Sequence, residues 1–219
     1  MNKRQYLLKA SLVFLAILIF IPVWMVIVAA FSDEASIAKN GFSLWAEKWS
    51  LNGMRYVLTF GSQLVNAYKV TVIVTVAGTL LTLLVTSLFA FSLSRNDFML
   101  RKPLTVYLLI TMIFSGGQLG SYLINSNVFQ MRNSIWVLIV PGCVSAMNCI
   151  IMRSFVHSNV PDALMEAAKI DGASEYRIYA QIVLPLMTPV LGAIGFMTAV
   201  NHWNQWATSM LYIDKRDLV

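Results

Sequence analysis

Three side-chain amides and two indole rings lie close together near the carboxyl end of the chain. Asn201, Asn204 and Gln205 are spaced i, i+3 and i+4, so a helix would place them on one face. Trp203 and Trp206 flank these amides. Amides beside indoles suit a sugar, which offers hydroxyls and apolar C–H faces. The same residues also suit an aromatic belt at a membrane surface, and the sequence leaves both interpretations open.

Glycines interrupt an earlier apolar stretch. The run 115–120 reads Ser-Gly-Gly-Gln-Leu-Gly, a composition that disfavours a regular helix. Non-helical backbone inside a membrane is tolerated only where protein or a water-filled cavity covers it. The run therefore predicts a bend, and Gly116 and Gly117 become candidates to line a translocation path. A packing notch or a helix end is the alternative.

The segment 159–185 holds the signals for a helix, a turn and a second helix. Pro161 suits the first turn of a helix, and Asp162 and Glu166 lie favourably near its positive end. Gly172 predicts a stop in the left-handed conformation.

Ser174 can cap the second helix, which we expect to end at residues 184–185. The first helix offers a compact apolar knob for another protein's groove, formed by Leu164, Ala168 and Ile170. A plain amphipathic connector is the alternative interpretation of this segment.

The composition indicates where these segments reside. The 219 residues are 58% hydrophobic and 12% charged, whereas a soluble domain is roughly 45–50% apolar and about 25% charged. So few charges make a soluble single-domain enzyme or a disordered chain untenable, and a polytopic membrane protein remains. The net charge of +6 is typical of the inner loops of such a protein, not of nucleic-acid binding. Cys143 and Cys149 would face different sides of a helix, so neither a disulfide nor a metal ligand set is predicted.

Apolar runs predict an all-α bundle of five membrane spans. They cover residues 10–31, 70–93, 104–124, 135–152 and 186–206, each close to the roughly 20 residues that cross a bilayer. The first run is too long for a cleaved signal peptide, so we interpret it as an uncleaved span. With the amino terminus inside, nine of the Lys and Arg residues lie in inner segments and seven in outer ones. The two shortest inner segments each hold three of them, which favours this orientation.

The interiors of the predicted spans hold no Asp, Glu, Lys or Arg, and His202 is their one ionisable group at depth. Ion-driven carriers usually need such charges, and a hydrolytic membrane enzyme needs an acid–base pair. Energy for uphill transport would therefore enter from outside the membrane. Five threonines at helical spacing beside Gly78 in the second run predict close helix packing, with a pore-lining stripe as the alternative.

The segment 159–185 resembles the EAA loop of permease subunits in binding-protein-dependent ABC importers. That pattern runs Glu-Ala-Ala, three residues, Gly, nine residues, Ile, one residue and Leu-Pro. The chain meets it with residues 166–168, Gly172, Ile182 and residues 184–185. Residues 170–174 and 184–186 look like the carbohydrate-uptake branch, related to the maltose permeases. Residues 114–117 and 200–204 look like permeases for complex oligosaccharides.

The resemblance, which covers roughly residue 5 to the carboxyl end, implies a membrane-spanning subunit for a sugar or oligosaccharide in a bacterial cytoplasmic membrane. Its partners would be a second, homologous permease, two cytoplasmic ATPases and an extracytoplasmic solute-binding protein. ATP and Mg would bind to the ATPases, and this chain would hold no cofactor, metal or catalytic residue. Residues 157–185 would be the cytoplasmic loop of a single type-1 transmembrane domain over residues 1–219.

The resemblance also assigns roles to residues. Coupling to the ATPase would fall to Glu166, Ala167, Ala168, Asp171, Gly172, Leu184 and Pro185. Candidates for the substrate path are Gly116, Gly117, Asn201, Trp203 and Asn204. The family usually has six spans, so we expect that this sequence is cut short after the fifth. The competing functions are a membrane scaffold and a passive channel, both without an ATPase partner.

Overall fold

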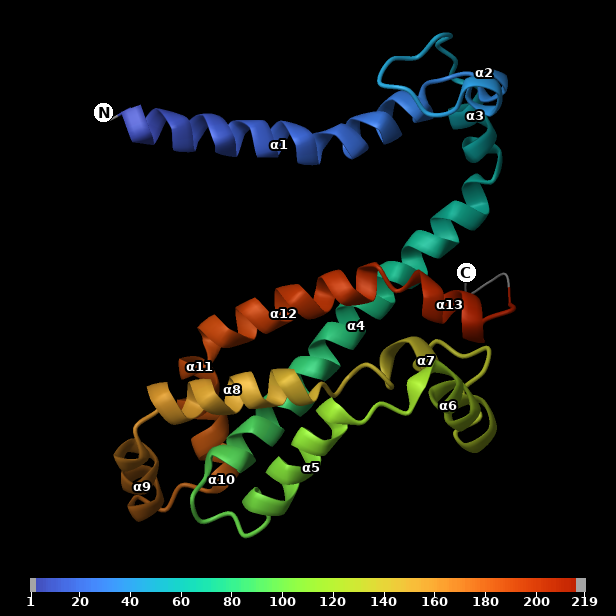
Figure 1. Cartoon of the computed structure of the whole chain (residues 1–219). Coiled ribbons are helices and arrows are strands. Elements are labelled where there is room, and N and C mark those ends of the chain that lie inside the picture. Colours follow the sequence, from blue (N-terminus) through green and yellow to red (C-terminus); the bar gives the residue numbers. More distant parts are fainter. Residues whose placement is uncertain (1–2, 216–219) are drawn as a thin grey trace. The chain divides into compact units, whose positions relative to one another are not determined.

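A computed structural model describes residues 3–215, which form helices joined by turns and loops (Figure 1). The helices are α1 (Lys3–Ala30), α2 (Glu34–Asn40), α3 (Asn52–Thr59), α4 (Gly61–Ser94), α5 (Arg101–Ile113), α6 (Gly117–Leu123), η1 (Ile124–Val128), α7 (Trp136–Ile139), α8 (Ala146–Asn159), α9 (Asp162–Ile170), α10 (Glu175–Ile178), η2 (Tyr179–Val183), α11 (Leu184–Leu186), α12 (Thr188–Trp203) and α13 (Trp206–Tyr212). Over these residues no strand forms, and one isolated bridge pairs Ser32 with Trp49. The predicted all-α class is thereby confirmed for the described part of the chain.

The chain divides into two compact units, residues 1–64 and 65–219. In the first unit, Leu8–Ala30 is an apolar, largely unburied helical stretch long enough to cross a membrane. The first predicted span is therefore continuous. The loop after α1 folds back on the end of that helix: Ser50 N–H donates to Phe31 O at 2.8 Å, and Trp24 Nε1–H donates to Leu44 O at 3.0 Å.

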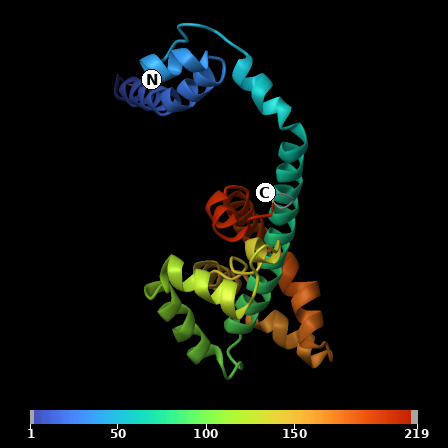
Figure 2. The same cartoon turned by 90° about the vertical axis from the view of Figure 1, so that its right-hand side faces the viewer.

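The long helix α4 organises the second unit. In Figure 2, α9 and α10 lie on one side of its lower part and α5 lies on the other. The buried face of α4 repeats at helical spacing and includes Val74, Gly78, Thr82, Thr86 and Ala90. The close packing predicted for this threonine-rich helix is confirmed, because these small residues let neighbouring helices approach.

A histidine ring makes the tightest of these contacts. A Cβ atom added to Gly78 would lie 2.6 Å from His202 Nε2, so only glycine leaves room for the ring. His202 is 6% exposed, and one of its ring nitrogens, Nδ1, lies 3.1 Å from Gln205 Oε1. Gln205 Nε2–H in turn donates to Leu138 O at 3.1 Å. The contacts of His202 and Gln205 therefore tie α12 to α4 and α7.

The third predicted span, 104–124, bends within the glycine-rich run. Helix α5 ends at Ile113, and α6 begins at Gly117 in a direction 117° away. Gly117 has φ +70°, a left-handed conformation that glycine adopts without strain. The predicted bend is confirmed, and a single straight helix over this range is not what the chain forms.

The fourth predicted span, 135–152, is wrong as a continuous helix. The structure divides it into α7, which has four residues, and α8, which begins at Ala146. Pro141 and Gly142 lie between them, and both residues disfavour a helix interior. Ser145 then caps α8, because its side chain accepts from Asn148 N–H at 3.4 Å.

The fifth predicted span, 186–206, corresponds to α12, which α11 precedes at an angle. The chain turns by 77° between the helical stretches Glu175–Leu186 and Thr188–Trp203. The described residues thus hold two helices long enough to span a membrane, or up to four spans if each bent pair crosses as one. The predicted number of five is not confirmed.

Candidate functional site: the helix–glycine–helix segment

The segment 159–185 folds as the sequence predicts over its first half. Helix α9 begins directly after Pro161, whose φ of −63° and extended ψ of 132° precede the first helical residue. It ends in a Schellman motif: Ala173 N–H donates to Ala168 O at 2.9 Å, and Gly172 N–H donates to Lys169 O at 3.0 Å. Gly172 has φ +78°, so the predicted left-handed glycine stop is confirmed.

The second helix begins as predicted but runs further. Ser174 caps it, because its hydroxyl oxygen accepts from Arg177 N–H at 3.4 Å. The chain then remains helical through α10, η2 and α11, so Leu184 and Pro185 do not end it. Pro185 cannot donate to a carbonyl one turn earlier, and the widened turn of η2 comes directly before its helix. The change in direction, 77° between the two helical stretches, falls at Met187 instead.

The two faces of α9 differ in burial. Met165 is 2% exposed, and Ala168 packs against the same apolar cluster that Phe91 and Val156 help to form. The opposite face is exposed and mostly apolar, with Ile170 86% exposed. Its members are Ala163, Leu164, Glu166, Ala167 and Ile170. The predicted knob therefore keeps Leu164 and Ile170, whereas Ala168 points inward.

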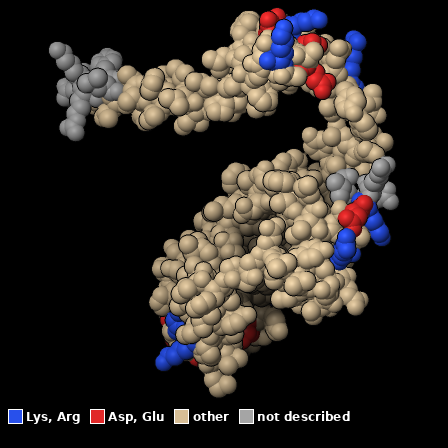
Figure 3. Space-filling view, turned by 45° about the vertical axis from the view of Figure 1, so that its right-hand side comes forward, with Lys and Arg blue, Asp and Glu red and all other residues tan. Residues whose placement is uncertain are grey.

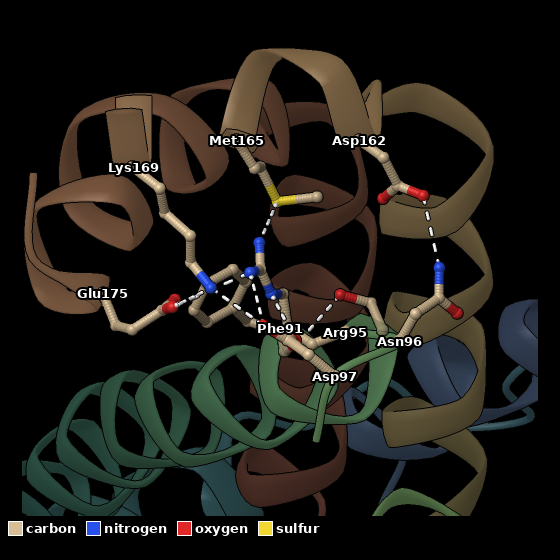
Figure 4. Close-up of polar contacts among 9 residues, drawn as sticks. Phe91, Arg95, Asn96, Asp97, Asp162, Met165, Lys169 and Glu175 are labelled. Carbon is tan, nitrogen blue, oxygen red and sulfur yellow. Dashed lines mark hydrogen bonds and ion pairs between the residues drawn. The ribbon is translucent and has the colours of Figure 1, made fainter. Parts of the chain in front are cut away.

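A cluster of charged residues joins α9 to the end of α4 (Figure 4). Asp97, in the turn after α4, accepts from Arg95 Nη2–H at 3.1 Å and from Lys169 Nζ–H at 2.8 Å. Glu175 Oε1 lies 2.7 Å from Lys169 Nζ and 3.7 Å from Arg95 Nη2. Lys169 thus bridges Asp97, which precedes α9 in the sequence, and Glu175, which follows it. The charges of this end of the second unit are visible beside α9 and α10 in Figure 3.

Further polar contacts hold the same turn against α9. Asn96 Nδ2–H donates to Asp162 Oδ2 at 3.3 Å, and Arg95 Nη1–H donates to Met165 Sδ at 3.4 Å. The Arg95 side chain is 11% exposed, so its charge relies on these partners more than a surface arginine would. The inner face of α9 is consequently fixed at both ends and in the middle, while its outer face is free.

The electrostatics of the cluster follow from these contacts. Hydrogen bonds from Arg95 and then Lys169 hold the pKa of the Asp97 carboxyl well below its usual range. Hydrogen bonds to Asp97 and then Glu175 raise the pKa of Lys169. Both groups are therefore charged near neutral pH, and the cluster suits a fixed mechanical link.

The predicted coupling residues fall into two groups. Glu166, Ala167, Asp171 and Gly172 are exposed on or beside the outer face of α9. Within residues 3–215, neither Glu166 nor Asp171 takes part in an ion pair. By contrast, Ala168 and Leu184 pack against the core, and Pro185 lies with Leu184 in α11, beyond α10 and η2. The structure therefore brings only part of the predicted set together on one surface.

The predicted substrate-path residues do not share one site. Trp203 lines a cavity of about 160 Å³ together with Thr71, His202 and Gln205. Gly117 lines a second, more open cavity that also reaches Gln205. Gly116, Asn201 and Asn204 are exposed and line neither cavity. Asn204 instead donates its Nδ2–H to Val200 O at 2.9 Å.

Sequence patterns do not identify Arg95, Asp97 or the tertiary contacts of Gln205. The first two directly follow an apolar run, and their opposite charges two residues apart signal a salt-bridged turn. Gln205 belongs to the predicted amide face, but its contacts with His202 and Leu138 depend on tertiary packing. No sequence signal for those contacts was available.

Comparison with known proteins points to one kind of membrane protein. No model of a known protein family matches the chain. The chain is 35% identical over 209 residues to the polygalacturonan/rhamnogalacturonan transport system permease protein YtcP of Bacillus subtilis, covering 95% of this chain and 72% of the relative. It is 31% identical to the protein LplC of the same species, over 89% of this chain and 65% of the relative.

A third relative and a solved structure agree with these. The arabinooligosaccharides transport system permease protein AraQ of Halalkalibacterium halodurans is 26% identical, over 98% of this chain and 77% of the relative. A subunit in the crystal structure of a bacterial ABC transporter involved in the import of the acidic polysaccharide alginate superposes with a TM-score of 0.81 at 20% identity. The alignment covers all of this chain and 78% of that subunit. The fold of the two chains is therefore the same over this length.

Proposed function

Because this chain belongs to the permease subunits of ABC sugar transport systems, we propose that α9 is its coupling helix and docks on a cytoplasmic ATPase. The observation that carries the proposal is the division of α9 into a fixed inner face and a free, mostly apolar outer face. A short amphipathic helix of this kind suits an apolar groove on a partner.

The outer face supplies the contacts of the proposed interface. Ala163 and Ala167 let the partner approach closely, and Ile170 fills an apolar pocket. Glu166 accepts hydrogen bonds or an ion pair from the rim of the groove. Gly172 lets the chain turn away directly after the helix, because only glycine adopts its φ of +78° without strain.

The charged cluster transmits movement of α9 to the membrane helices. When two ATPases close on ATP, they would draw the coupling helices of two permeases together. Asp97 bonds α9 to the turn after α4 through Lys169, so a displaced α9 carries the end of α4 with it. The energy source lies in the ATPases, which bind ATP and Mg, and residues 70–93 of α4 accordingly hold no charged side chain.

We further propose that the subunit forms half of a path for a sugar or oligosaccharide. The names of two relatives specify oligosaccharide or polysaccharide transport, and an indole beside an amide suits a sugar. Trp203 and Gln205 line the same cavity and are the best candidates for contact, with Gly117 at the neighbouring one. A second permease would supply the other half, and an extracytoplasmic binding protein would deliver the sugar. This arrangement requires the amino terminus and α9 on the cytoplasmic side.

Co-purification tests the docking proposal. The tagged protein is extracted mildly from its native membranes, and the proteins that accompany it are identified for wild type and for Gly172→Asp. Gly41→Asp is the matched control, because Gly41 has a φ of +77° and also has open space around it.

We expect an ATPase and a second permease with the wild type and the control, and loss of the ATPase with Gly172→Asp. Retention of the ATPase by Gly172→Asp contradicts docking through this turn. Absence of any ATPase from all three samples favours a scaffold or passive channel.

A further inference from the structure

A basic cavity lies beside the turn that follows α4, between that turn and residues of α5 and α8. It has a volume of about 750 Å³ and is lined at its charged end by Arg101 and Lys102 of α5 and by Arg153 of α8. Thr105 and Asn96 add a hydroxyl and an amide to the lining. Three cations from two helices thus face one open space, which is an arrangement suited to an anion.

Among residues 3–215, the basic side chains of this cavity find no acidic partner. Arg153 Nη1–H donates to the hydroxyl of Thr105 at 3.2 Å, and Arg101 donates to the side-chain oxygen of Asn96. Within the described residues, none of the three cations forms an ion pair. The one carboxylate in the lining, Asp97, already accepts from Arg95 and Lys169. The positive charge of the cavity is therefore left without compensation.

The cavity continues into an apolar, exposed stripe along α5. Val106 lines the cavity and is 54% exposed. Leu109, Ile110 and Ile113 follow it at helical spacing and are exposed as well. Lys102 stands at the head of this stripe, while Leu108 on the opposite side of α5 is buried. A ligand that fits both parts has an anionic head and a hydrocarbon tail.

We propose that this cavity binds the phosphate of an anionic phospholipid, whose acyl chain lies along the apolar face of α5. Arg101 and Arg153 donate to the phosphate oxygens, and Lys102 adds a third charge at the membrane surface. The charge of the site and the apolar stripe below it favour a lipid over a soluble anion. The inference rests on the membrane location of the family and not on docking by α9, so the two proposals fail independently.

Native mass spectrometry of the purified protein tests the site. The protein is titrated with phosphatidylglycerol and with phosphatidylcholine that carry the same acyl chains. The test variant is Arg101→Gln/Arg153→Gln. The control, Arg132→Gln/Arg177→Gln, removes the same charge from exposed arginines that do not line the cavity. Thermal unfolding without added lipid verifies that each variant is folded.

Wild type and control should prefer phosphatidylglycerol, and each arginine lost from the cavity should weaken its binding by about fivefold. The double test variant should then bind both lipids alike. Equal binding of the two lipids by wild type, or an unchanged preference in the folded test variant, overturns the proposal. Displacement of the lipid by millimolar inorganic phosphate also overturns it, in favour of a free-anion site. Failure of phosphate to displace the lipid supports it.

Discussion

Replacement of Asp97 by Asn examines the link between α9 and α4 most sharply. The substitution keeps the size of the side chain and removes the charge that accepts from Arg95 and Lys169. Arg95, at 11% exposure, is then left with Glu175 at 3.7 Å as its nearest acid. We expect α9 to loosen from the turn at residues 95–97 while the membrane helices stay folded.

The expected loss of stability is modest. Exposed ion pairs contribute about 0.2–1 kcal/mol, and Asp97 is 60% exposed, so solvent screens the pair. The two-point contact with the mostly buried guanidinium puts the Arg95–Asp97 pair near the upper end, at about 1 kcal/mol. A domain of this size would lose about 2–4 °C in Tm. The loss should shrink in 0.5 M salt, because exposed charges are screened there.

The pH dependence follows from the direction of the two shifts. Asp97 has a lowered pKa when folded, so its contribution is present above its ordinary pKa of about 3.9 and fades as the pH falls below that. Lys169 has a raised pKa when folded, so its contribution is lost only as the pH rises above about 10.4. The difference between wild type and Asp97→Asn should therefore be constant from about pH 5 to 9.

The assay compares sugar uptake per ATP hydrolysed in reconstituted vesicles, beside thermal unfolding in detergent. The control is Asp214→Asn. It removes the acid whose Oδ2 lies 2.8 Å from Arg132 Nη2, in an ion pair that is not part of the cluster at α9. We expect Asp97→Asn to lower the uptake per ATP severalfold and Asp214→Asn to leave it unchanged. Equal coupling ratios in the two variants would refute the mechanical role of the cluster.

Two further predictions concern packing in the second unit. Gly78→Ala should destabilise the protein by about 1–3 kcal/mol, because the new methyl group would overlap the confined ring of His202. Gly192→Ala, with nothing within 4 Å of the added atom, should cost far less, and similar melting temperatures for the two variants would contradict this. Ser87→Ala should cost about 1–3 kcal/mol, because it leaves the buried hydroxyl of Tyr179 without its 2.7 Å partner. Chemical unfolding of the purified protein measures that loss, and a neutral result would mean that another group satisfies Tyr179.

The parts of the molecule that the sequence predicts well are those governed by neighbouring residues. Pro161, Gly172 and Ser174 act within one helical turn of their own positions. The structure confirms the roles of Gly172 and Ser174 and places Pro161 directly before the helix, as its N-cap residue, and not within its first turn. The glycine bend near residue 117 is local in the same sense. The continuous helix predicted over 135–152 is wrong. That prediction rests on the apolar character of the run, whereas Pro141 and Gly142 interrupt the helix.

Contacts between residues that are far apart in the sequence could not be predicted from local patterns. Asp97 and Lys169 are 72 positions apart, and nothing in either local pattern identifies the other as its partner. The inward turn of Ala168 likewise follows from the packing of α9 on a core shared with α4 and α8. Trp203 and Asn204 are adjacent in sequence, yet only Trp203 lines a cavity, because the helix turns Asn204 back on its own backbone.

The central claim is that the outer face of α9 contacts an ATPase. A photoreactive amino acid placed at Ile170, which is 86% exposed, tests it in native membranes. The control position is Phe42 of the first unit, which is 69% exposed and lies, in the proposed topology, on the opposite side of the membrane. We predict that irradiation links an ATP-binding subunit to the probe at position 170 and not to the probe at position 42. No such product from position 170, or equal products from both positions, would contradict the account.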